Sequence, residues 1–222
     1  MNKFYHYGDS FADCDKSEEI FSKKIAKEFG LSYVNKSGAG KSNEYLLSYL
    51  LSDIPKFKKG DKLLINFTFF TRGGFISDDE EFLSTNIIYD DQNKAKSDEH
   101  KKFPMYDIEL DRTNNLLDFL LNYNWDYYVR LFKFLFLPTI KIIKEIGVDV
   151  RYFYVRQSPL NNGSELKPFK NFLPNKYEIT FGNDDYITFL RRNRWKNEES
   201  IHYTWGIQDK LADVFIDKWN DK

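Results

Sequence analysis

Two short segments at opposite ends of the chain contain the residue types of a serine nucleophile and its base. Gly8-Asp9-Ser10 follows the first run of aromatic residues, where a strand is expected to pass into a helix. In parallel α/β sheets, ligands bind at the carboxyl ends of the strands, and helix N-termini direct N–H groups into the same crevice. Ser10 is therefore well placed for chemistry, but a serine hydroxyl needs an activating base.

The search for that base is short because the sequence contains only 3 histidines. His6 lies within the first predicted strand, His100 in a polar segment, and His202 just before the last predicted helix. A loop ahead of a helix can reach the carboxyl-end crevice, whereas a mid-strand histidine more often lies in a sheet face. His202 is accordingly the predicted general base.

A carboxylate stands close to this histidine in Glu199-Ser200-Ile201-His202. One turn of chain can bring the Glu199 carboxylate to the far nitrogen of the imidazole, where it would fix the tautomer and stabilise the imidazolium. Glu198 and Asn197 are alternative partners for His202. The alternative to a catalytic role is that these residues lie in a solvated loop and have this spacing by chance. The predicted triad therefore has the chain order serine, acid, histidine.

The elements that would position these residues begin in β-α-β-α order. The segment 62–67 is almost continuously apolar, which is typical of a strand covered on both faces of a parallel sheet. Pro138 should kink or divide a long apolar helical region. The predicted strands are 4–7, 31–34, 62–67, 148–155 and a short one at 177–181, and the predicted helices are 16–29, 44–54, 114–146 and 204–219.

The chain is expected to form one domain spanning residues 1–222, with a polar insertion or lid at about 73–111. The 33 basic and 34 acidic residues nearly cancel, so neither nucleic acid nor a membrane surface is expected as a partner. Cys14 is the single cysteine, which excludes an intrachain disulfide and a cysteine-built metal site. No signal peptide or transmembrane segment is evident, so a cytoplasmic location is predicted, and the sequence contains no signal for oligomeric state.

The two end motifs together resemble those of the SGNH (GDSL-type) hydrolases. The segment 35–43 resembles the second block of that family, with Gly40 as the best match to its oxyanion-hole glycine. The third block usually reads Gly-x-Asn-Asp, but here the strand continues as Asn66-Phe67-Thr68-Phe69-Phe70-Thr71-Arg72 and lacks that Asn. By register, Thr68, Thr71 or Arg72 is expected to replace that Asn as a hydrogen-bond donor to the oxyanion.

This resemblance implies a flavodoxin-like, three-layer α/β/α sandwich with a mostly parallel sheet, and acyl transfer without a metal or other cofactor. Ser10 would attack the ester, His202 would move the proton and Glu199 would orient the imidazole. The oxyanion would be bound by Ser10, Gly40 and Thr71. The residues expected to contact a small-molecule or carbohydrate ester, acetyl by analogy, are Asp9, Asn43 and Arg72.

Two other classes of function compete with this hypothesis. Loss of the family Asn permits a weak or inactive hydrolase fold that serves as a binding or structural module. The segment Gly38-Ala39-Gly40-Lys41-Ser42 between a strand and a helix resembles part of a phosphate-binding P-loop. The first glycine position of that motif is Asn35, and the third strand offers Asn66 rather than an aspartate, which disfavours nucleotide binding.

Overall fold

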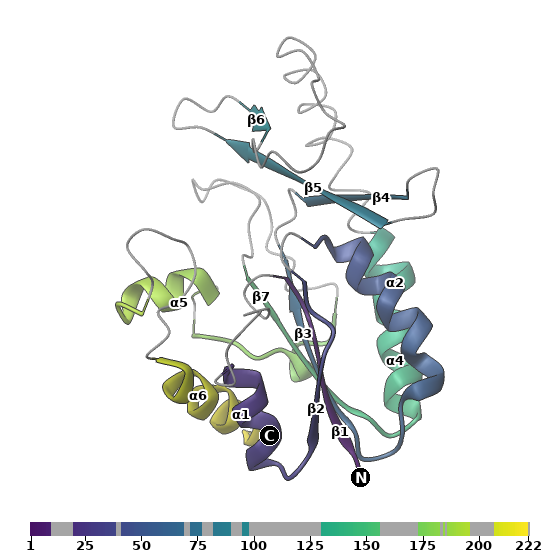
Figure 1. Ribbon diagram of the computed structural model, residues 1–222, viewed down its shortest axis with the longest axis vertical. Helices are drawn as coiled ribbons and strands as arrows, with labels where there is room; N and C mark the ends of the chain where they lie inside the picture. The colour runs from purple at the N-terminus through teal and green to yellow at the C-terminus, as the bar shows by residue number, and fades with distance from the viewer. Residues whose placement is uncertain are drawn as a thin grey trace.

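The computed structural model describes most of the two ends of the chain and part of its middle. Side chains are described for residues 1–9, 20–38, 41–68, 130–155, 173–182, 184, 186–195 and 207–221, and backbone alone for 72–76, 82–89 and 95–97. Figure 1 shows these residues as a parallel sheet between two layers of helices, with a smaller sheet beyond one end.

The main sheet contains four strands, all parallel, in the order β2-β1-β3-β7. This is the strand order of a flavodoxin-like sheet, in which β1 and β3 flank the topological switch point. The predicted α/β class with a parallel sheet is confirmed. The bounds of the strands are β1 Lys3–Tyr7, β2 Ser32–Asn35, β3 Lys62–Phe67 and β7 Asp149–Tyr154.

Helices cover both faces of this sheet (Figure 1). Three α-helices pack on one face: α1 Phe21–Glu28, α5 Tyr186–Arg192 and α6 Gln208–Asn220. The opposite face is covered by α2 Asn43–Asp53, the π-helical segment η2 Leu131–Phe136 and α4 Leu137–Glu145. Short 3-10 turns follow α2 at Ile54–Lys56 (η1) and β7 at Asn175–Tyr177 (η4).

Each face buries its own hydrophobic cluster, because alternate side chains of a strand point to opposite sides. Tyr5 and Tyr7 of β1 pack with α2 and α4, whereas Phe4 packs with α1 and α6. Phe67 of β3 contacts Phe132 and Phe136 with ring centroids 4.8 and 5.0 Å apart, in the edge-to-face geometry that aromatic pairs favour. Both faces of the sheet are therefore covered, as the apolar strands predicted.

The segment expected as an insertion contains a second sheet. Strands β4 Arg72–Ile76, β5 Phe82–Tyr89 and β6 Ala95–Ser97 pair antiparallel in that order, and β4 lies beside α2 (Figure 1). The polar composition of this segment gave no indication of these strands. Its function as a lid stays a prediction.

Two predicted elements differ from the structure in detail, and one helix was not predicted. The described part of the long apolar helix changes from π-helical turns at Leu131–Phe136 to α-helical turns at Leu137–Glu145, beside Pro138, which has no N–H to donate. Thr139 Oγ1 donates to the Leu135 carbonyl at 2.7 Å. The strand expected at 177–181 is reduced to single-residue bridges, of Glu178 with Tyr152 and of Phe181 with Asp184. Helix α5 was not predicted. No helix within the described ranges combines the length and apolar character needed to cross a membrane.

Candidate functional site

The candidate site lies at the carboxyl ends of β1 and β3, and its described part is a buried polar network around Asp9. The Asp9 side chain is 0% exposed. Its Oδ1 accepts a hydrogen bond from Asn66 Nδ2 at 2.8 Å, and its Oδ2 accepts one from Thr68 Oγ1 at 2.5 Å. A buried carboxylate needs such donors, because an unpaired charge in the interior is strongly destabilising. The carboxylate of the Gly-Asp-Ser motif is thus directed into the protein.

The backbone after β3 is held in turn by Asn43, the first residue of α2. Asn43 Oδ1 accepts from the Thr68 N–H at 3.0 Å, and Asn43 Nδ2 donates to the Thr68 carbonyl at 3.4 Å. The side chain therefore satisfies both backbone groups, as a neighbouring strand would. Ser42 caps the same helix, since its Oγ accepts from the Tyr45 N–H at 3.4 Å. Helix α2 is fixed at its start to the end of β3.

The loop after β2 meets the loop after β1 through the backbone. The Gly38 N–H donates to the Gly8 carbonyl at 3.0 Å, and the Lys36 N–H donates to the His6 carbonyl at 2.8 Å. These two bonds carry the parallel pairing of β1 and β2 beyond the last paired strand residues. Gly8 is followed by Asp9 and Ser10, and Gly38 by Ala39 and Gly40. The two loops therefore run side by side up to these glycines.

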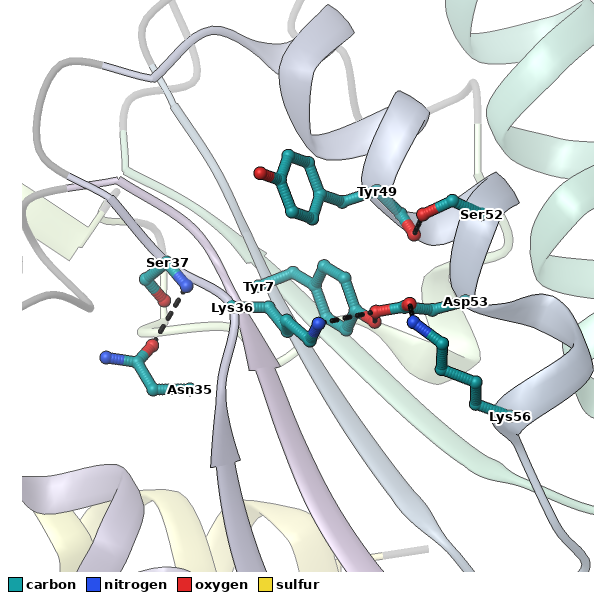
Figure 2. Close-up of polar contacts among 8 residues, drawn as sticks. All are labelled: Tyr7, Asn35, Lys36, Ser37, Tyr49, Ser52, Asp53 and Lys56. Atoms are coloured by element: carbon teal, nitrogen blue, oxygen red, sulfur yellow. Dashed lines mark hydrogen bonds and ion pairs between the residues drawn. The ribbon is translucent and has the colours of Figure 1, made fainter.

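The same loop after β2 is anchored by an ion-pair cluster around the buried carboxylate of Asp53, shown in Figure 2. Asp53, at the end of α2, is 1% exposed, accepts from Tyr7 Oη at 2.7 Å, and pairs with Lys36 Nζ at 3.2 Å and Lys56 Nζ at 2.5 Å. Burial acts to raise the pKa of Asp53, but the hydrogen bonds from Lys56, Tyr7 and Lys36 lower it below its ordinary value. Lys36 thus ties the loop to α2.

A turn completes the start of that loop. Asn35 Oδ1 accepts from the Ser37 N–H at 2.9 Å, the short-range bond that defines an Asx-turn. Ser37 Oγ also donates to the His6 carbonyl at 3.3 Å. The two residues are labelled in Figure 2. The path of the chain from β2 towards Gly38 is therefore set by local side-chain bonds.

On the opposite face, the starts of α1 and α6 lie together beside β1. The Phe21 N–H donates to Gln208 Oε1 at 2.7 Å, and the rings of Phe21 and Phe215 stack with centroids 4.9 Å apart. Phe21 also contacts His6 of β1, with ring centroids 5.6 Å apart. Helix α6 therefore begins next to the first strand, and the segment preceding it, which contains His202, connects to this point.

His6 is buried in the sheet, as its mid-strand position predicted. Burial lowers the pKa of His6 to about 3, and the nearby Asn66 amide offsets only part of that shift. Within the described residues, neither ring nitrogen has a well-formed hydrogen-bond partner. The imidazole is neutral near pH 7 and enclosed by protein. The structure therefore gives His6 no access to a substrate.

The structure describes only some of the residues predicted for catalysis and binding. The predicted residues that lie outside the described ranges are Ser10, Gly40, Thr71, Asn197, Glu198, Glu199 and His202. Arg72 is described through its backbone, which starts β4 and pairs with Asn86 of β5. Asp9 and Asn43, predicted to contact substrate, are both 0% exposed and bonded to other parts of the protein.

Two alternatives from the sequence can be compared with described side chains. Thr68, one of three substitutes for the missing oxyanion donor, uses its hydroxyl to bond Asp9. Lys41, the lysine of the partial P-loop motif, precedes α2 and has its Nζ 4.1 Å from the centroid of the Tyr45 ring in the first turn of that helix. Sequence reasoning did not assign a function to Asn66, whose amide group within an otherwise apolar strand was the available signal.

Comparisons with known proteins add little to this description. No family model and no curated protein matches the chain. One similar solved structure is that of protein YxiM from Bacillus subtilis, with a TM-score of 0.49 and 12% sequence identity. The match covers 98% of this chain and 55% of that one, so the chain spans about half the length of YxiM. The α/β assignment rests on the strand order, and any function must be argued from the residues.

Proposed function

We propose that the chain is a serine ester hydrolase of the SGNH type, with Ser10 as nucleophile, His202 as base and Glu199 as the acid that orients it. The observation that carries this proposal is the hydrogen bond from the Gly38 N–H to the Gly8 carbonyl. It joins the loop leading to Ser10 with the loop leading to Gly40, two residues beyond the bond in each case. A nucleophile and an oxyanion donor from different loops need this proximity.

The position of α6 supports His202 as the base. His202 precedes Gln208 by six residues, a length of chain that reaches at most about 20 Å. Gln208 is itself bonded to the start of α1, beside β1. Ser10 lies three residues beyond the end of β1, so we propose that a histidine tethered to Gln208 reaches the same end of that strand. Glu199 is close enough along the chain to accompany the imidazole.

The reaction proceeds through an acyl-enzyme. Ser10 Oγ bonds to the ester carbonyl carbon as its proton passes to His202, and the N–H groups of Ser10 and Gly40, with Thr71, bind the oxyanion. His202 then returns the proton to the alcohol oxygen as the ester C–O bond breaks. A water molecule repeats the attack and releases the acid. The substrate class proposed is a small acyl ester, acetyl on a carbohydrate, and Arg72 is proposed to contact it.

Hydrolysis of p-nitrophenyl acetate by the purified chain tests the nucleophile. Ser10→Ala and His202→Ala should each lower kcat/KM by at least about 10³-fold, because they remove the nucleophile or its base. Ser52→Ala is the matched control, since the Ser52 hydroxyl is exposed on α2 and donates to the Tyr49 carbonyl at 2.9 Å. A fluorophosphonate should add once, to Ser10. Equal rates for the wild type and Ser10→Ala would contradict the proposal.

Release of acetate from acetylated saccharides tests the substrate class separately. If p-nitrophenyl acetate is cleaved but no acetylated saccharide is, the ester chemistry stands and the carbohydrate assignment fails. Saccharide binding without turnover by the wild type would instead favour a binding module that keeps the hydrolase fold.

A further inference from the structure

Asp9, the aspartate of the Gly-Asp-Ser motif, is buried and hydrogen-bonded to other side chains of the protein. Asp9 is 0% exposed, and its carboxylate accepts a hydrogen bond from Asn66 on Oδ1 and from Thr68 on Oδ2. Bonds from an O–H or N–H group to a carboxylate are among the stronger hydrogen bonds in proteins. The side chain is therefore bound on both oxygens before any substrate arrives, and it has no exposed surface with which to contact one.

The two donors are themselves held in place. Asn66 lies in β3, hydrogen-bonded within the sheet, and its carboxamide occupies the space beside Gly8. Thr68 follows the strand, and its N–H and C=O groups are both bonded by Asn43. All four polar side chains of this network, Asp9, Asn43, Asn66 and Thr68, are fully buried. Buried and mutually bonded groups of this kind have few alternative arrangements.

The network joins two loops and the start of a helix at the carboxyl end of the sheet. Asp9 belongs to the loop after β1, Thr68 to the loop after β3, and Asn43 to the start of α2 after β2. The residue that follows Asp9 is Ser10. A side chain fixed on two oxygens restrains its own backbone, and hence the peptide from which the chain passes into Ser10.

We propose that Asp9 is a positioning residue, which through Thr68 and Asn66 fixes the Ser10 peptide for nucleophilic attack and oxyanion binding. This assignment rests on the proposed function, because it takes Ser10 as the nucleophile. It replaces the sequence-based expectation that Asp9 and Asn43 contact substrate. Thr68 then acts by holding Asp9, and Asn43 acts by holding the Thr68 backbone. The oxyanion donor of the third block is accordingly a residue other than Thr68.

Removal of a single hydroxyl tests this assignment. Thr68→Val keeps the shape of the side chain but removes the hydroxyl that donates to Asp9 Oδ2, whereas Thr68→Ser keeps that hydroxyl. For p-nitrophenyl acetate, Thr68→Val should lower kcat by about 10- to 100-fold, because displacing a reacting group by about 1 Å has effects of this size. KM should stay within about 2-fold, and Thr68→Ser should recover most of kcat.

Thr139→Val is the matched control, because the Thr139 hydroxyl donates to the Leu135 carbonyl in another part of the molecule. A second readout is hydrogen exchange of the backbone amides at residues 8–12, measured by mass spectrometry at a pH where all variants are folded. Exchange there should accelerate in Thr68→Val and not in Thr139→Val.

The two readouts separate the failure of this inference from the failure of the proposed function. Unchanged kcat and unchanged exchange in Thr68→Val would overturn the positioning assignment, and so would a fall in kcat that merely follows the unfolded fraction. If the wild type hydrolyses no ester, the proposed function fails, and with it the catalytic part of this assignment. The exchange of residues 8–12 would then still decide whether Asp9 fixes this turn.

Discussion

Position 8 requires glycine because a larger side chain would not fit there, and not because of its backbone conformation. A Cβ atom at this position would lie 1.3 Å from Asn66 Oδ1 and 2.3 Å from its Cγ, although the Gly8 backbone is not in the left-handed region. The Asn66 carboxamide is not free to move aside, because its Nδ2 donates to Asp9. A side chain at Gly8 would therefore displace the amide that holds the aspartate, and steric and polar costs combine at one residue.

Gly8→Ala should lower the free energy of unfolding by about 2–4 kcal/mol. Overpacking of a buried site costs about 1–3 kcal/mol, and weakening the bond between Asn66 and Asp9 adds about 1 kcal/mol. Urea denaturation measures this change. Gly38→Ala is the control, because the new Cβ would meet only the flexible Lys41 side chain, at 3.0 Å. Equal stabilities of the two variants would show that the Asn66 amide is not confined as described.

At the scale of elements, the Asp149 carboxylate connects the last helix to the sheet. Asp149 Oδ2 at the start of β7 accepts from Trp219 Nε1 at 2.7 Å and from Lys62 Nζ at 2.9 Å. Burial acts to raise the pKa of Asp149, but the bonds from Lys62 and Trp219 lower it below its ordinary value. The Lys62 ammonium also lies 5.1 Å from the centroid of the Trp219 ring. The C-terminal end of helix α6, which follows His202, is thus held to β3 and β7.

Trp219→Phe should lower the free energy of unfolding by about 1–3 kcal/mol, because it removes a hydrogen bond to a charged acceptor along with some ring area. Equilibrium denaturation in urea measures the change. Trp195→Phe is the matched variant, since Trp195 packs edge-on against Phe189 at 5.5 Å and is only partly buried. If both substitutions had the same effect, the bond to Asp149 would contribute nothing beyond packing.

The elements that the sequence predicted well are those with an uninterrupted local pattern. The strand expected at 62–67 is β3 with the same bounds, because its apolar residues are covered on both faces. Helix α5 escaped prediction because it is short and ends in charged residues, Arg191 and Arg192. The strands of the second sheet also escaped, since the apolar residues of β5 fall in two short groups separated by Ser84-Thr85-Asn86 and form no continuous apolar run.

The sequence displays the motif of the candidate site, but it does not reveal which residues contact that motif. Gly8-Asp9-Ser10 is a local motif that a sequence displays directly. The bonds that surround it join residues far apart in the chain, since Asn66 and Thr68 lie 57 and 59 positions from Asp9. A sequence gives no register for such contacts until the order of the strands is known. Asp9 was therefore expected at the substrate, whereas its side chain lies in the interior.

At the scale of the whole molecule, covering both faces of the sheet encloses His6 and makes stability depend on pH. The pKa of His6 is lowered to about 3 in the folded chain, against an ordinary value of 6.5. Between these values the unfolded chain binds a proton that the folded chain does not, so stability is complete above pH 6.5 and falls as the pH is lowered. This loss approaches about 1.4 kcal/mol per pH unit once the unfolded histidine is protonated.

His6→Leu should remove this dependence, because leucine fills a similar volume and does not titrate. The comparison is made by urea denaturation of both proteins between about pH 7 and pH 4. Asp53 and Asp149, whose pKa values are lowered, also lose stabilisation in acid, but they do so equally in both chains. The difference between the two unfolding free energies should therefore grow steadily in favour of His6→Leu below pH 6. A constant difference would mean that the imidazole reaches solvent or a proton acceptor in the folded protein, and that the sheet is less completely covered than its packing indicates.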